Sequence, residues 1–118
     1  MSNFLSGPTY SIHSKPKKLI VMLHGYGDNA DNFSHLASAI DEDNWFAKYL
    51  ILNGPETIPN YPMGKQWFDL YPNGIYIADA GANEIKIVRE SVLSSVKKIE
   101  LTIKYHLSDL KLKIEDCI

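Results

Sequence analysis

The sequence is poor in cysteine, has no excess of basic residues and contains no long apolar run. Cys117 is the single cysteine, which excludes a disulfide scaffold or a cysteine-rich zinc site and fits a reducing compartment. Twelve basic against fourteen acidic residues give a formal charge of -2, so no basic field attracts nucleic acid or anionic lipid. The longest purely apolar run, residues 19–23, falls far short of a membrane span of about 20 residues, and residues 1–18 lack the apolar stretch of a secretion signal. We expect a soluble, cytoplasmic protein without a nucleic-acid partner.

The composition is typical of a chain that folds. The 118 residues are 45% apolar, 22% charged and 11% aromatic, which excludes a disordered tail, a collagen-like fibre or a coiled coil. A chain of this length holds one hydrophobic core, so residues 1–118 are expected to form a single α/β domain.

The first half of the chain has the pattern of a strand, a helix and a second strand. Residues 19–23 are all apolar, which is typical of a strand buried on both faces in a parallel sheet. Asn32 or Ser34 is expected to cap a short amphipathic helix that ends near Ile40. Residues 49–52 form the second apolar run, so a parallel pair with a right-handed crossover is predicted.

The second half begins with a long aromatic segment and continues as a helix. Residues 55–81 contain several prolines and are predicted to form an irregular loop of the kind that often carries function. Residues 84–107 repeat apolar side chains every three or four positions, which predicts a helix covering a sheet. Residues 111–116 are expected to turn into a new strand that starts at residues 117–118.

The glycine-rich loop after the first predicted strand has two functional interpretations. Gly25-x-Gly27-x-x-Ala30 matches a dinucleotide-binding pattern, but Asp28 would place a carboxylate where a pyrophosphate must bind, and Asn53 stands where the ribose-binding acid is needed. The second interpretation is an oxyanion loop, in which a backbone N–H stabilises the tetrahedral intermediate of acyl transfer.

In the oxyanion interpretation, Tyr26 presents its N–H between Gly25 and Gly27. A plain strand-to-helix turn without chemistry is the alternative. A metal site made by His24, Asp28 and His35 is disfavoured, because these residues lack regular ligand spacing.

The order of the motifs resembles the phospholipase/carboxylesterase family of α/β-hydrolases, which includes acyl-protein thioesterases. The segments that carry the resemblance are residues 19–28 (LIVMLHGYGD), Asn32-Phe33, residues 50–55 (LILNGP) and the triplet Trp67-Phe68-Asp69. The resemblance implies a partial α/β-hydrolase fold, with a mostly parallel sheet and crossover helices. It also implies a serine carboxylic-ester hydrolase that acts on acyl esters or thioesters without a cofactor.

The same resemblance implies roles for individual residues. The N–H of Tyr26 would be an oxyanion donor, in a loop formed by His24, Gly25, Tyr26, Gly27 and Asp28. His24 and Asp28 would brace this loop rather than act as acid or base. Trp67, Phe68 and Asp69 would lie near the substrate pocket, although packing of a loop on the sheet edge would also explain Trp67 and Phe68.

The sequence contains no Gly-x-Ser-x-Gly elbow for a nucleophile. In the family this elbow follows the strand after the long helix, so we expect the triad beyond Ile118 and no ester hydrolysis by this chain alone. The serines at positions 34, 38, 91, 94 and 95 lie on predicted helices and are expected to be surface residues. Cys117 has no nearby base that would make it a nucleophile.

The expected sheet leaves one edge of its most apolar strand open. Residues 19–23 would pair with residues 50–52 on one side and with the strand that begins at Cys117 on the other. An open apolar edge favours self-association unless a separate segment completes the sheet. Two other functions stay open: a non-catalytic binding module that uses the aromatic loop 55–76 and, more weakly, a nucleotide-binding strand–helix–strand unit.

Overall fold

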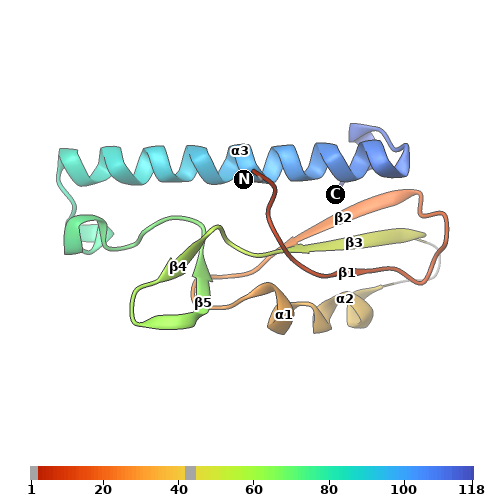
Figure 1. Ribbon diagram of the computed structural model, residues 1–118, viewed down its shortest axis with the longest axis horizontal. Coiled ribbons are helices and arrows are strands. Elements are labelled where there is room, and N and C mark those ends of the chain that lie inside the picture. Colours follow the sequence, from red (N-terminus) through yellow and green to blue (C-terminus); the bar gives the residue numbers. More distant parts are fainter. Residues whose placement is uncertain (1–2, 42–44) are drawn as a thin grey trace.

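The computed structural model describes residues 3–41 and 45–118. Figure 1 shows three layers: the long helix α3 (Ala82–Leu110) on one side of a sheet, and the short helices α1 (Ala30–Phe33) and α2 (His35–Ile40) on the other. The sheet has three strands in the order β1-β3-β2, and a separate hairpin lies beside it.

The centre of the sheet is a parallel pair. Strand β2 (Lys18–Leu23) runs beside β3 (Ala47–Leu52), in a register that places Leu19 opposite Lys48. Because α1 and α2 connect the two strands, the predicted strand, helix and parallel strand are confirmed.

The side chains of β3 alternate between the two faces of the sheet. Tyr49 and Ile51 belong to a buried cluster with Ala30 of α1 and Ala37 of α2. Leu50 and Leu52 belong to a second buried cluster, which includes Leu107 of α3. A strand that is covered on both faces needs apolar residues at consecutive positions, and this explains the unbroken apolar run.

The prediction of a mostly parallel sheet is not confirmed, because the described residues also form two antiparallel strand pairings. Strand β1 (Thr9–Tyr10) pairs antiparallel with β3, and β4 (Glu56–Ile58) forms an antiparallel hairpin with β5 (Tyr61–Gln66). Strand β1 is too short to give a hydrophobic period. The hairpin was missed because proline usually marks the absence of a strand, whereas a two-stranded edge tolerates it.

The hairpin turns at Asn60, which has a left-handed backbone with φ of 64°. Asparagine tolerates this region better than most residues because its short polar side chain can form local hydrogen bonds. Residues 55–81 are therefore not one irregular loop: the hairpin is followed by two 3-10 turns, Pro72–Gly74 and Ile77–Asp79.

The cap of the first helix also differs from the prediction. Asn29, rather than Asn32 or Ser34, is the N-cap, and its side-chain oxygen accepts a hydrogen bond of 2.9 Å from the N–H of Asn32. Ser34 is the N-cap residue of α2, which ends at Ile40 as predicted, although its side chain forms no capping hydrogen bond. The shift places the helix start directly after the loop at Asp28.

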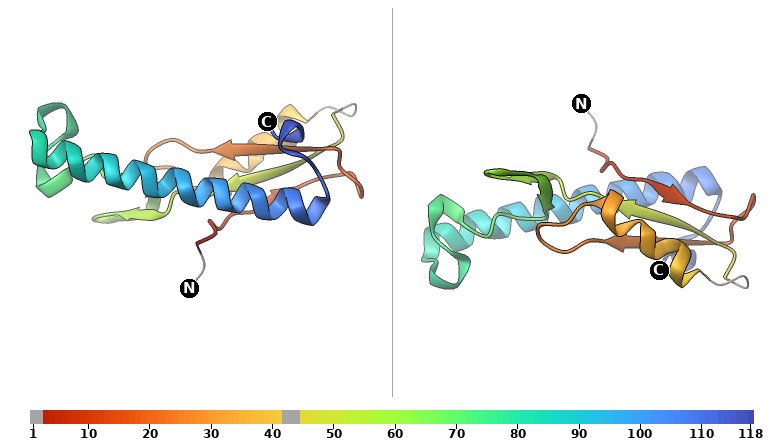
Figure 2. Two further views of the ribbon diagram at one scale, coloured as in Figure 1. Left: turned by 90° about the horizontal axis from the view of Figure 1, so that it is seen from above. Right: turned by 90° about the horizontal axis from the view of Figure 1, so that it is seen from below.

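Helix α3 is longer than predicted and covers the sheet with only part of its length. Its C-terminal half packs on the sheet through Ile99, Ile103 and Leu107. Figures 1 and 2 show that the N-terminal half extends past the sheet, and there Ile85 remains 47% exposed. The apolar stripe predicts the helix correctly but not how much of it is covered.

The last residues return to the sheet as predicted. After a 3-10 turn at Ile114–Asp116, Cys117 forms a parallel bridge with Leu19. The N–H of Ile118 donates to the carbonyl of Leu19 at 2.8 Å, and the N–H of Val21 donates to the carbonyl of Ile118 at 2.8 Å. These contacts lie on the side of β2 that faces away from β3. Within the described residues, no helix is both long and apolar enough to cross a membrane.

Candidate functional site

The loop after β2 is built around a buried histidine. His24 is 3% exposed, and its Nε2 accepts a hydrogen bond of 2.9 Å from the N–H of Gly54. This contact requires the proton to be on Nδ1, which lies 2.7 Å from the carbonyl oxygen of Gly25 and donates to it. Both ring nitrogens of His24 are therefore engaged by backbone groups, one in the loop itself and one in the segment after β3.

Trp67 ties the same loop to the long helix. Its indole Nε1 donates to the carbonyl of His24 at 2.8 Å, and the two ring centroids are 5.1 Å apart. The carbonyl of Trp67 in turn accepts a hydrogen bond from the hydroxyl of Ser95 on α3. Trp67 therefore lies beneath the loop and connects it to α3.

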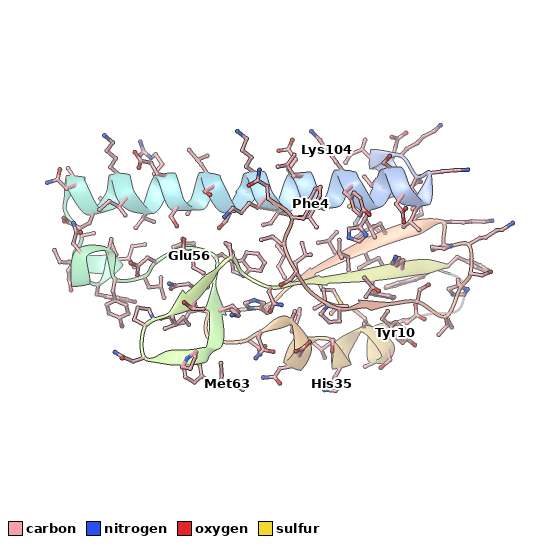
Figure 3. The ribbon with its side chains drawn as sticks, in the orientation of Figure 1. Phe4, Tyr10, His35, Glu56, Met63 and Lys104 are labelled. Carbon is pink, nitrogen blue, oxygen red and sulfur yellow. The ribbon has the colours of Figure 1, made fainter. Side chains whose placement is uncertain are left out.

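Two serines of α3 are not the free surface residues that were expected. Ser95 is only 4% exposed, because its hydroxyl reaches the carbonyl of Trp67. Ser91 donates to the carboxylate of Glu56 at 3.0 Å. Figure 3 shows Glu56 on the side of the hairpin that faces α3, whereas Met63 lies at the far end. Both serines thus fasten the segment after β3 to the helix.

Strand β5 clamps the glycine-rich turn from the other side. The N–H of Gly27 donates to the carbonyl of Lys65 at 3.2 Å, and the N–H of Lys65 donates to the carbonyl of Asp28 at 2.9 Å. Gly27 has φ of 84°, a conformation that glycine adopts without strain. A Cβ at Gly64 would lie 2.9 Å from the carbonyl oxygen of Gly27, so this close approach requires a residue without a side chain.

The start of α1 has little capacity left for a phosphate. The N–H of Asn29 donates to Asp28 Oδ1 at 2.8 Å, and the N–H of Ala30 donates to Asn53 Oδ1 at 2.9 Å. Asn29 itself accepts the N–H of Asn32. Since these donors are occupied by side chains, the dinucleotide interpretation loses the contacts it would need.

Tyr26 lies between His24, which Gly54 and Trp67 hold, and Gly27, which Lys65 holds. Its side chain is 49% exposed, and no acceptor for its backbone N–H is found in residues 3–41 and 45–118. By contrast, the N–H of Gly27 donates to Lys65, and that of Asp28 donates to the carbonyl of Gly25 at 3.2 Å. The N–H of Gly25 likewise has no acceptor among the described residues, so the loop offers the backbone donors of Gly25 and Tyr26 to an external oxygen atom.

A hollow of about 370 Å³ adjoins this residue. The residues that line it come from the loop, the hairpin and the following 3-10 turn: Tyr26, Ile58, Pro59, Gln66, Asp69, Tyr71 and Gly74. Of the sequence-predicted pocket residues, Asp69 lines the hollow, whereas Trp67 and Phe68 do not. Asp69 Oδ1 accepts a hydrogen bond of 2.8 Å from the N–H of Tyr71.

Sequence reasoning missed two residues of this region. The buried Gln66 lines the hollow, and its amide Nε2 donates to the carbonyl of Thr57 at 3.2 Å, across the hairpin. Lys65 clamps the loop through its backbone. Neither belongs to a motif, and only recognition of the hairpin would have drawn attention to them.

Two groups outside the hollow have shifted pKa values. Burial raises the pKa of the Cys117 thiol, which leaves less thiolate and agrees with the expectation that Cys117 is not a nucleophile. Burial, followed by the nearby charge of Lys48, lowers the pKa of His106. Among residues 3–41 and 45–118, no three His, Cys, Asp or Glu side chains gather as a metal site.

The order of these parts agrees with a comparison with known families. The model of the phospholipase/carboxylesterase family matches residues 9–115. The chain belongs to the phospholipase/carboxylesterase family. The family indicates a hydrolase of the esterase or phospholipase type, and the match covers the loop, the hollow and all of α3.

Proposed function

We propose that this chain supplies the oxyanion loop and part of the acyl pocket of a serine carboxylic-ester hydrolase. In this proposal His24, Gly25, Tyr26, Gly27 and Asp28 form the loop, and the N–H of Tyr26 donates to the developing oxyanion. The hollow beside Tyr26 receives part of the ester, with Asp69 at its wall. Trp67 acts beneath the loop, and Phe68 belongs to the same pocket segment.

The observation that carries the proposal is the unengaged N–H of Tyr26 in a loop that is held on both sides. His24 and Trp67 fix one end of the loop, while Lys65 fixes the turn. A donor that is held in place before the reaction stabilises charge without a reorganisation cost, and removal of one such donor lowers turnover by about 10²–10³-fold in known enzymes.

The nucleophile, the base and its orienting acid must come from outside these 118 residues, because the sequence contains no Gly-x-Ser-x-Gly. Once supplied, the serine would attack the ester carbonyl, the loop would stabilise the oxyanion, and water would release the acyl group. No cofactor takes part in these steps. The chain alone is expected to be inactive.

The test is complementation: the 118-residue chain is mixed with the C-terminal part of a family member. That part starts at the strand that carries Gly-x-Ser-x-Gly. The chain alone should not hydrolyse p-nitrophenyl butyrate, and the mixture should do so in a manner that a serine-directed inhibitor blocks. In the mixture, Tyr26→Pro removes the N–H and should lower kcat by about 100-fold or more. The matched variant Tyr26→Phe keeps the N–H and should stay within about twofold of the unsubstituted chain. Equal turnover by both variants would contradict the role of this N–H.

A non-catalytic binding module is the second candidate. The hairpin favours it, because Tyr61 and Met63 are 50% and 69% exposed at its end, and exposed apolar side chains often mark binding surfaces. A complementing polypeptide that restores a folded complex without serine-dependent turnover would favour the module over the hydrolase.

A further inference from the structure

A second hollow, lined in part by Asn53 and Gly54, contains two lysines and, among the described residues, no carboxylate. It measures about 330 Å³, within the range typical of small-molecule sites. The lining comes from the N-terminal segment, the end of β3, β5 and α3: Phe4, Leu5, Ser6, Asn53, Gly54, Pro55, Lys65 and Lys98. Figure 1 shows the N-terminal segment running from α3 across the sheet towards β1.

The two lysines of this hollow have no partner of opposite charge. Lys18 pairs with Asp116 at 3.7 Å and Lys104 with Glu100 at 2.9 Å, but no ion pair within residues 3–41 and 45–118 involves Lys65 or Lys98. Two like charges facing one hollow repel each other unless an anion lies between them.

A hydroxyl donor stands beside the lysines. Asn53 Oδ1 accepts the N–H of Ala30, so its amide nitrogen points the other way and donates to Ser6 Oγ at 3.2 Å. Ser6 Oγ thus uses a lone pair for Asn53, and its own proton has no acceptor among the described residues. The lining of the hollow therefore includes two lysines without an ionic partner among the described residues and one hydroxyl that is free to donate.

We propose that this hollow binds a phosphate group, either as free phosphate or as a small phosphate monoester. A phosphate carries a charge near -2 at neutral pH and has several strong acceptor oxygens, which matches two lysines and a hydroxyl. Lysine binds phosphate as a point charge, whereas a planar carboxylate is better matched by an arginine fork, which this hollow lacks. Phe4, Leu5 and Pro55 provide an apolar wall for the organic part of a monoester.

This proposal does not depend on ester hydrolysis, and its test measures binding to the 118-residue chain itself. Inorganic phosphate is titrated into the ¹⁵N-labelled chain while the backbone amide signals are followed. We expect saturable shifts at Ser6, Asn53, Gly54 and Lys65, which weaken as ionic strength rises. The same titration is repeated with phenyl phosphate. Tighter binding of phenyl phosphate than of inorganic phosphate identifies a phosphate monoester as the ligand, whereas equal binding of the two identifies free phosphate. Shifts spread over lysines outside the hollow, or no saturation, would overturn the proposal.

Two substitutions test the lysines, with a third as a control. Lys65→Met and Lys98→Met should each weaken phosphate binding by at least about tenfold, because each removes one of the two compensating charges. Lys86→Met removes the same charge from α3 about 18 Å away, at roughly 1.5 Å per residue, and should leave binding unchanged. Equal affinity in all three variants would refute the site. If a lysine variant unfolds, the shift map of the unsubstituted chain still decides the question.

Discussion

The indole N–H of Trp67 donates a hydrogen bond of 2.8 Å to the carbonyl oxygen of His24, a residue 43 positions earlier in the chain. The contact joins the end of the buried strand β2 to the segment that follows the hairpin. Through the hydroxyl of Ser95, which donates to the carbonyl of Trp67, the connection continues to α3. The candidate oxyanion loop is therefore held by tertiary contacts as well as by its glycines.

Trp67→Phe should destabilise the chain by about 1–3 kcal/mol, because the partly buried carbonyl of His24 loses its donor while most of the ring packing remains. Urea unfolding measures this change. Trp45→Phe, at an exposed position, is the control and should change the free energy of unfolding by less than about 0.5 kcal/mol. Equal effects of the two substitutions would show that the hydrogen bond contributes little.

Ser95→Ala should lower the free energy of unfolding by about 1–3 kcal/mol, because it leaves the carbonyl of Trp67 without its donor. The neighbouring Ser94→Ala removes an exposed hydroxyl and should be nearly neutral. Thermal or urea unfolding of the two variants measures the difference. An unchanged free energy of unfolding in Ser95→Ala would contradict a stabilising role for the hydrogen bond from Ser95 to Trp67.

Gly27→Ala should cost about 1–2 kcal/mol, because φ at this position is 84° and no neighbouring atom lies close enough to clash with an added Cβ. The effect is therefore one of backbone conformation alone. Gly25→Ala is a matched control, since a Cβ there also meets open space and its φ lies outside the left-handed region. Comparable losses from both substitutions would argue against a conformational origin.

His106 should make the fold less stable in acid. Burial lowers its pKa in the folded chain below the ordinary value of about 6.5, so the unfolded chain binds the proton more readily. The contribution of His106 is present above that ordinary value and is lost as pH falls through the lowered one. Urea midpoints at pH 7.5 and pH 5.5 should differ less for His106→Gln than for the unsubstituted chain. The exposed His35→Gln serves as the control, and an unchanged pH dependence in His106→Gln would count against the prediction.

Self-association through the edge of β2 remains a prediction. Cys117 and Ile118 pair with one part of this edge, and Leu23 at the end of the strand is 45% exposed. Leu23→Lys should reduce association in sedimentation velocity, because a charge at an open edge opposes strand pairing. Leu93→Lys places the same charge at an exposed position on α3 and should have no such effect. A purely monomeric, cooperatively melting chain would contradict the prediction.

The strands with buried faces and the long helix could be read from the sequence, because burial imposes a hydrophobic pattern on residues 19–23, 49–52 and 84–107. The hairpin could not be read in the same way. Its prolines hide the strand pattern, and its pairing with the loop depends on the close approach of Gly64 to Gly27. Lys65 and Gln66 were missed for the same reason, since a contact between distant segments leaves no periodic signal.

By itself, the sequence determined the parallel pair, the glycine-flanked Tyr26 and the family, because these depend on local patterns and on a run of motifs in order. Only the tertiary structure decided which donors remain unengaged. Among the residues that the structure describes, the N–H groups of Gly27 and Asp28 have acceptors and those of Gly25 and Tyr26 have none, and His24 has both ring nitrogens occupied. The physical reason is that hydrogen-bond satisfaction depends on which acceptors the fold brings near. Here the acceptors come from Gly25 and from Lys65, which lies far along the chain.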